Sequence, residues 1–203
     1  MGEYRSILRR PLSGVFHNEI AMNEKIEQLI QVAKEAGAYG AVYLDAEHIV
    51  LNPQFEEICR GNNCGRYGKC YMCPPDLGDM ETLMARVRKF PRAVIYQTVS
   101  PLEDSFDFEG MMEAGAAHSR LSGRIQDSIK GILKQEFLHL STGCNLCSRC
   151  AKMDDLPCRY PERALGAMEG YGFDVYQTVK DTELKYINGV NTVTYFGVIL
   201  FTE

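Results

Sequence analysis

Apolar residues recur at helical spacing in three segments of this chain. The first begins at Asn23, a residue suited to cap a helix, and ends at Gly37. A second apolar face covers residues 79–90, and a third covers residues 111–140 with a period near 3.6. These patterns predict three amphipathic helices. Two shorter helices are predicted, one beginning at Pro161 and one over residues 173–180.

Four short runs rich in β-branched and aromatic residues predict strands between these helices. They are residues 41–44, 49–51, 93–99 and 192–201. The alternation of strands and helices predicts an α/β fold, with a small mixed sheet flanked by helices and two cysteine-rich metal-binding loops at its edge.

No repeat or composition break divides the chain, so we expect a single metal-binding domain over residues 1–203. Residues 1–20 show no sustained period and are interpreted as an N-terminal arm or a short strand.

Composition restricts the class of protein. The 203 residues are 45% hydrophobic, which is ordinary for a folded protein with its own core. The net charge of -5 does not provide the positive potential that attracts nucleic acid or an anionic membrane. Neither an export signal nor an apolar stretch of about 18 residues is present, so the sequence favours a cytoplasmic protein without a membrane partner.

The eight cysteines fall into two groups of four along the chain. The first group is Cys59, Cys64, Cys70 and Cys73, and the second is Cys144, Cys147, Cys150 and Cys158. Four disulfides would require an oxidising compartment, whereas thiolate ligands suit a reducing one. We therefore interpret all eight as metal or cofactor ligands rather than as disulfide partners or inert buried residues.

The second group has a spacing close to that of ferredoxins. The run Cys144-x2-Cys147-x2-Cys150 matches the way in which ferredoxins surround a four-iron cluster. Cys158 follows after seven residues rather than three, and in two-cluster ferredoxins the last cysteine serves the other cluster. The centre that Cys158 serves is therefore open.

The first group contains only one C-x2-C pair, Cys70 and Cys73, whereas structural zinc sites usually combine two. Glycines between its cysteines allow the backbone to turn its N–H groups toward sulfur. Cations lie within both groups, namely Arg60, Arg66, Lys69, Arg149, Lys152 and Arg159. Two [4Fe-4S] clusters are the favoured cofactors, with zinc as the alternative.

Several spaced motifs of the chain occur together in one family. They are Tyr67-Gly68-Lys69, Met72-Cys73-Pro74-Pro75, the Cys144 run, Pro157-Cys158-Arg159-Tyr160-Pro161-Glu162 and Tyr171-Gly172-Phe173-Asp174-Val175. Residues 40–203 resemble the cysteine-rich, predicted metal-binding family of unknown function that is found chiefly in anaerobic bacteria and archaea. The resemblance implies metal or iron–sulfur binding in an anaerobe, and Cys70 is the one cysteine outside the family pattern.

Three functions are consistent with these observations. The favoured one is one-electron transfer by two clusters between redox partner proteins in anaerobic metabolism, because no dinucleotide, phosphate, protease or hydrolase motif is present. An enzyme or maturation factor with an open cluster iron is the second, and a zinc-binding interaction module is the third. An enzyme would need an acid or base near the cysteines, and the candidates are Glu56, Glu57, Asp76, Asp154, Asp155 and Glu162.

Overall fold

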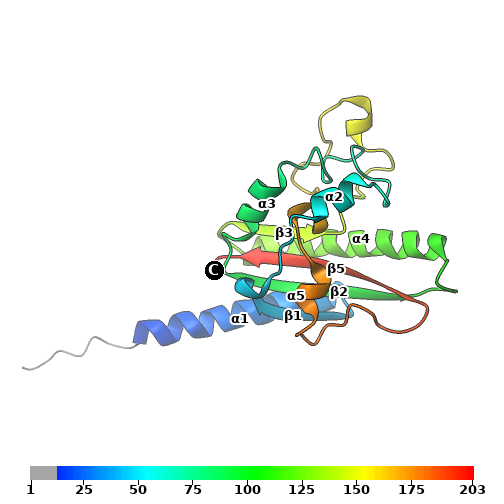
Figure 1. The fold of residues 1–203 in the computed structure, drawn as a ribbon. Coiled ribbons are helices and arrows are strands. Elements are labelled where there is room, and N and C mark those ends of the chain that lie inside the picture. The colour runs from blue at the N-terminus through cyan, green and yellow to red at the C-terminus, as the bar shows by residue number, and fades with distance from the viewer. Residues whose placement is uncertain (1–12) are drawn as a thin grey trace, which may run out of the picture.

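The computed structural model describes residues 13–203, which form a five-stranded sheet with helices on both faces (Figure 1). The strands, in chain order, are β1 (Gly40–Asp45), β2 (Arg92–Pro101), β3 (Phe137–Ser141), β4 (Gly166–Ala167) and β5 (Thr192–Phe201). Their spatial order is β1-β2-β5-β3-β4, and only the short β3–β4 pair is parallel. The predicted mixed α/β sheet is confirmed.

The two long central strands, β2 and β5, bury side chains on both faces of the sheet. Val94 and Tyr96 belong to the apolar core on one face, while Ala93 and Ile95 belong to the core on the other. Successive side chains of a strand point to opposite faces, so a continuous apolar run is what a strand covered on both sides requires.

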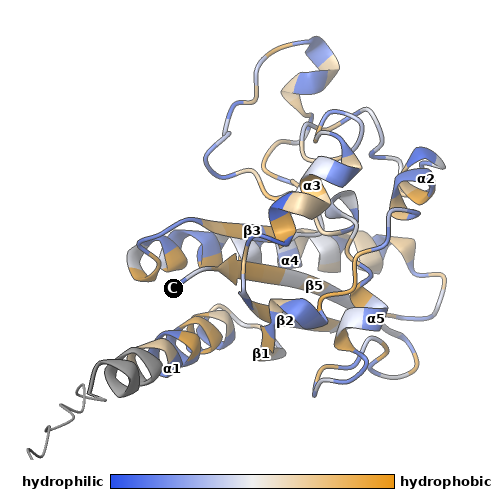
Figure 2. Ribbon diagram, turned by 60° about the vertical axis from the view of Figure 1, so that its left-hand side comes forward, coloured by the Kyte–Doolittle hydropathy of each residue, from blue (hydrophilic) through white to orange (hydrophobic). Residues whose placement is uncertain are grey.

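Two long helices cover the first face (Figure 2). They are α1 (Ser13–Glu35) and α4 (Phe108–Ile132). Leu29 from α1 and Ile125 and Ile129 from α4 are fully buried against the sheet. The apolar faces of the two helices thus supply this half of the core.

The opposite face is covered by shorter elements. They are α2 (Phe55–Arg60), α3 (Met80–Val87), α5 (Val175–Val179) and two 3-10 turns, η1 (Ala46–His48) and η3 (Glu169–Tyr171). A third 3-10 turn, η2 (Ala151–Asp154), lies in the second cysteine-bearing loop. Leu83, Phe173 and Val179 are among the residues that fill the core beneath them. The cysteine-bearing segments extend from this layer, above the β3 side of the sheet (Figure 1).

Most of the predicted elements are confirmed. Strand β5 has the predicted bounds, and β1, β2, α3 and α5 lie within a few residues of them. Asp79 caps α3, because its side chain accepts a hydrogen bond from the Thr82 backbone N–H at 2.8 Å. Gly37, with a φ of 102°, follows α1 as the sequence predicts.

Four predictions about secondary structure are wrong. Helix α1 begins at Ser13 rather than Asn23, so residues 13–20 are helical, while the rest of the expected arm lies outside the described residues. Residues 49–51 make only an isolated bridge, between Leu51 and Phe173. The helix expected over residues 111–140 ends at Ile132, and β3 follows it. No helix begins at Pro161, where the structure has a turn.

A buried polar network connects the sheet to α4. The Tyr96 hydroxyl donates to Ser122 Oγ at 2.8 Å and lies 2.7 Å from His139 Nε2. Ser122 in turn lies 2.8 Å from Ser141 Oγ, and His118 bonds to Thr98 and to the Phe196 carbonyl. Both histidines are buried, and the ring nitrogens of each have hydrogen-bond partners.

These two histidines make stability depend on pH. Burial lowers the pKa of His118 to about 4 and that of His139 to about 3, so both stay neutral when folded. The unfolded chain protonates them below about pH 6.5. Stability contributed by the depressed pKa values is therefore present above that pH and lost as pH falls toward 4, by about 1.4 kcal/mol per pH unit for each histidine.

We expect His118→Gln to reduce this dependence by about half. Denaturant unfolding of the wild type and the variant at pH 7 and pH 5 measures it, because shared contributions from carboxylates cancel in the comparison. An equal loss of unfolding free energy between pH 7 and pH 5 in both proteins would show that His118 does not contribute to the pH dependence of stability.

Candidate metal centre

Glycines shape both cysteine-bearing loops. Gly65 and Gly68 lie between cysteines of the first group with φ values of 71° and 67°, and Gly143 precedes Cys144 with a φ of 96°. Side chains larger than hydrogen are strained in this region of φ. These glycines let each loop turn back on itself, so the two loops approach one another.

The second loop follows directly from β3 and is held to the first by polar contacts. Arg66 donates to the Cys144 carbonyl at 3.0 Å and also bonds to the Asn145 side chain. The Tyr71 hydroxyl donates to the Leu156 carbonyl at 2.9 Å. Residues far apart in the sequence are thereby fixed as two walls of one site.

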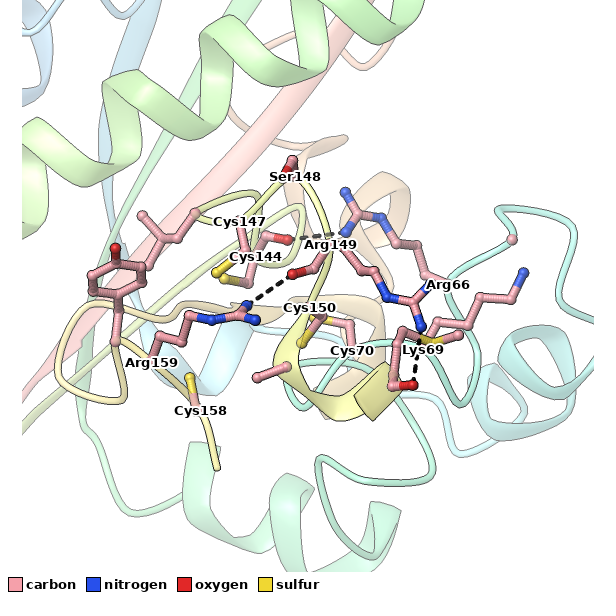
Figure 3. Close-up of a pocket in the computed structure, with 15 residues that line it drawn as sticks. Arg66, Lys69, Cys70, Cys144, Cys147, Ser148, Arg149, Cys150, Cys158 and Arg159 are labelled. Carbon is pink, nitrogen blue, oxygen red and sulfur yellow. Dashed lines mark hydrogen bonds between the residues drawn. The ribbon is translucent and has the colours of Figure 1, made fainter. Parts of the chain in front are cut away.

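Five cysteines line a hollow of about 210 Å³ between these walls (Figure 3). They are Cys70, Cys144, Cys147, Cys150 and Cys158. All four cysteines of the second group line this hollow, including Cys158, whose centre the spacing leaves open. Cys70 comes from the first group, so the two groups of the sequence are not two separate groups in space.

Cys70 lies beside Cys73 and Cys144 at the junction of the loops. Hydrogen bonds from the thiols of Cys144 and Cys73 lower the pKa of Cys70, and the same contacts raise the pKa of both donors. Cys70 is only 2% exposed and Cys73 8%. Cys70 therefore lies between two other thiols, one from each loop.

The remaining two cysteines, Cys59 and Cys64, lie farther out. Cys64 is exposed, and burial raises the pKa of Cys59, with the nearby charges of Glu169 and Cys64 adding to the effect. Burial also raises the pKa of Glu169 itself. Glu169 was not among the predicted acids because it is distant in sequence from every cysteine.

Four cations face the hollow, namely Arg66, Lys69, Arg149 and Arg159. Arg159 donates to the Arg149 carbonyl at 2.9 Å, and Arg149 pairs with Asp154 at 2.9 Å. The other two predicted cations are engaged elsewhere. Arg60 pairs with Glu56 and Glu57 on the surface of α2, and Lys152 pairs with Asp76 at 2.7 Å.

None of the six predicted acids lines this hollow among the residues that the structure describes. Four of them form the ion pairs given above, Asp155 ends η2 in a left-handed conformation, and Glu162 accepts a hydrogen bond from Lys130 through its backbone carbonyl. Asp76 is half-buried and the other five are exposed, and within the described residues no carboxylate lines the hollow.

The donor chemistry of the hollow fits a thiolate-bound metal centre, since five thiols and four cations surround one space. All eight cysteines are free thiols rather than disulfides. Within residues 13–203, however, no three His, Cys, Asp or Glu side chains are arranged so that they could hold a metal ion. The predicted metal-binding loops are thus thiol-rich loops without a defined ion site.

The sheet and the thiol-lined hollow define a cysteine-rich α/β protein with a candidate metal centre at one edge of its sheet. The chain belongs to the predicted metal-binding protein family DUF2284, whose model matches residues 42–201. No curated protein and no solved structure matches the chain. Over the described residues, no helix combines the length and apolar character needed to cross a membrane.

Proposed function

We propose that this protein binds two [4Fe-4S] clusters and transfers single electrons between protein partners in the cytoplasm of an anaerobe, acting as a single domain. The observation that carries the proposal is the hollow lined by five cysteines and four cations. A four-iron cluster with four thiolates has a net charge of about -2, which nearby guanidinium and ammonium groups stabilise.

The contacts support a shared arrangement of ligands. Cys147, Cys150 and Cys158 line the hollow and serve one cluster, while Cys59, Cys64 and Cys73 serve the other. Cys70 and Cys144 touch each other where the loops meet, so each cluster takes one of them as its fourth ligand. Exchange of a ligand between neighbouring sequence groups is also the arrangement of two-cluster ferredoxins.

Spacing rather than charge favours iron over zinc. A zinc ion with four thiolates carries the same net charge, so the cations would stabilise either centre. Structural zinc sites usually join two C-x2-C pairs, whereas the run of Cys144, Cys147 and Cys150 has the ferredoxin spacing.

The residues around the thiols have defined parts in this function. Arg66 holds the Cys144 backbone and places its positive charge beside the sulfurs. The hydrogen bond from Tyr71 to the Leu156 carbonyl keeps the two loops together. A bound cluster would supply the one-electron chemistry. Its reduction potential depends on solvent exposure and on nearby charge.

Anaerobically purified protein tests this function. We expect brown absorbance that bleaches on addition of dithionite and returns on reoxidation, with a paramagnetic signal in the reduced state. Metal-containing protein that shows neither bleaching nor a reduced-state signal would contradict electron transfer. A colourless protein with stoichiometric zinc would replace the proposal with a zinc-stabilised interaction module.

A further inference from the structure

A second hollow, of about 340 Å³, lies between α4 and the loop that carries Cys144. On α4, Ser119, Arg120 and Arg124 line it, and Asn145 and Arg163 line it from the facing segments. Cys144 contributes to this hollow as well as to the one lined by five cysteines, so the two spaces meet at that residue.

The charge of this second hollow is opposite to that of the chain. Arg120, Arg124 and Arg163 face a single acid, Asp127, although the whole chain carries a net charge of -5. Arg163 pairs with Asp127 at 3.3 Å, and Arg124 donates to the Ala36 carbonyl at 2.7 Å. No hydrogen bond or ion pair joins the side chain of Arg120 to any residue in the described range 13–203. Its guanidinium is available to a ligand.

Polar and apolar walls complete the hollow. The Asn145 amide donates to Ser119 Oγ at 2.8 Å, which ties the loop to α4. Ser141, which is 1% exposed, adjoins the hollow, and its hydroxyl lies 2.8 Å from that of Ser122 in the buried polar network. Leu146 and Leu165 add apolar surface. The site therefore combines fixed polar groups with room for a short carbon skeleton.

We propose that this second hollow binds a small organic anion, a carboxylate or phosphate ester, beside the Cys144 loop. A guanidinium binds such oxyanions through paired N–H donors, and that of Arg120 is unpaired among the residues that the structure describes. The concave shape selects a small molecule over the flat face of an acidic protein. A ligand here would contact the residue at which the proposed metal centre begins.

This inference concerns binding and does not depend on which metal the thiols hold. Its test is isothermal titration calorimetry of the anaerobic full-length protein at low ionic strength, with succinate and glycerol phosphate as anionic probes and succinamide as the uncharged analogue. We expect saturable binding of at least one anion, and none of succinamide.

Variants assign the binding to this hollow. Arg120→Ala should weaken anion binding about tenfold or more, because it removes a charge-assisted contact. Asp127→Asn should strengthen it, because it removes the one opposing charge. Arg88→Gln, at an exposed arginine outside the hollow, should leave it unchanged. Circular dichroism confirms that each variant is folded.

Two results would overturn the inference. One is equal anion affinity in the wild type and in folded Arg120→Ala protein. The other is salt-dependent binding of polyglutamate with no saturable binding of either small anion, which would reassign the arginines to an acidic protein partner. Bound iron measured in the same preparations separates either result from a failure of the proposed electron transfer.

Discussion

Replacing Cys70 with alanine is expected to reduce the bound iron by about half, from roughly eight to roughly four atoms per chain, the content of two and of one four-iron cluster. Cys70 lies on the wall of the hollow and contacts both Cys73 and Cys144. Its loss removes a fourth ligand from one cluster and leaves the other ligand set intact. Iron and acid-labile sulfide analysis of anaerobic protein measures the effect.

Ser148→Ala is the matched control for this change. Ser148 lines the same hollow and is exposed, but it provides no thiolate. We expect its iron content to equal that of the wild type. Full iron content and an unchanged reduced-state spectrum in folded Cys70→Ala protein would show that Cys70 is not a ligand and would remove the shared arrangement.

Replacing Gly197 with alanine is expected to destabilise the fold by about 3 kcal/mol, the upper part of the usual range for overpacking a core. Gly197 pairs with Tyr96 across β2 and β5. A Cβ at Gly197 would lie 2.2 Å from the Tyr96 hydroxyl oxygen, so the fully buried ring would have to move. That movement also breaks its hydrogen bonds to Ser122 and His139.

Gly131→Ala provides the comparison for Gly197. Gly131 lies near the end of α4, and nothing lies within 4 Å of the Cβ that alanine would add. Alanine favours a helix by up to about 1 kcal/mol over glycine, so this change should be neutral or stabilising. Denaturant unfolding compares the two variants, and equal unfolding free energies would mean that Tyr96 is not held as described.

The sequence predicts strands well where burial on both faces produces continuous apolar runs, as in β2 and β5. It fails at residues 137–140, because Phe137 and Leu140 continue the spacing of the apolar face of α4. Pairing of this segment with β5 makes it a strand rather than the end of a helix. Leu138 and Leu140 align with Leu200 and Val198 of β5, and these long-range partners carry no local signal.

For the candidate metal centre, spacing predicts that Cys144, Cys147 and Cys150 lie near one another, but it leaves the place of Cys158 open. It does not predict the contact of Cys70 with Cys144, because that contact depends on how two loops from different parts of the fold meet. The hollow beside α4 was missed for the same reason. Arg120 and Arg124 lie about one helical turn apart on the exposed side of α4, where charged residues are ordinary. Arg163 comes from a loop far along the chain.

Metal and sulfide analysis of protein purified without oxygen tests whether the cysteines hold two four-iron clusters. We expect about eight iron atoms and about eight acid-labile sulfides per chain, with little zinc. Folded, oxygen-free protein that contains neither iron nor sulfide would contradict this expectation.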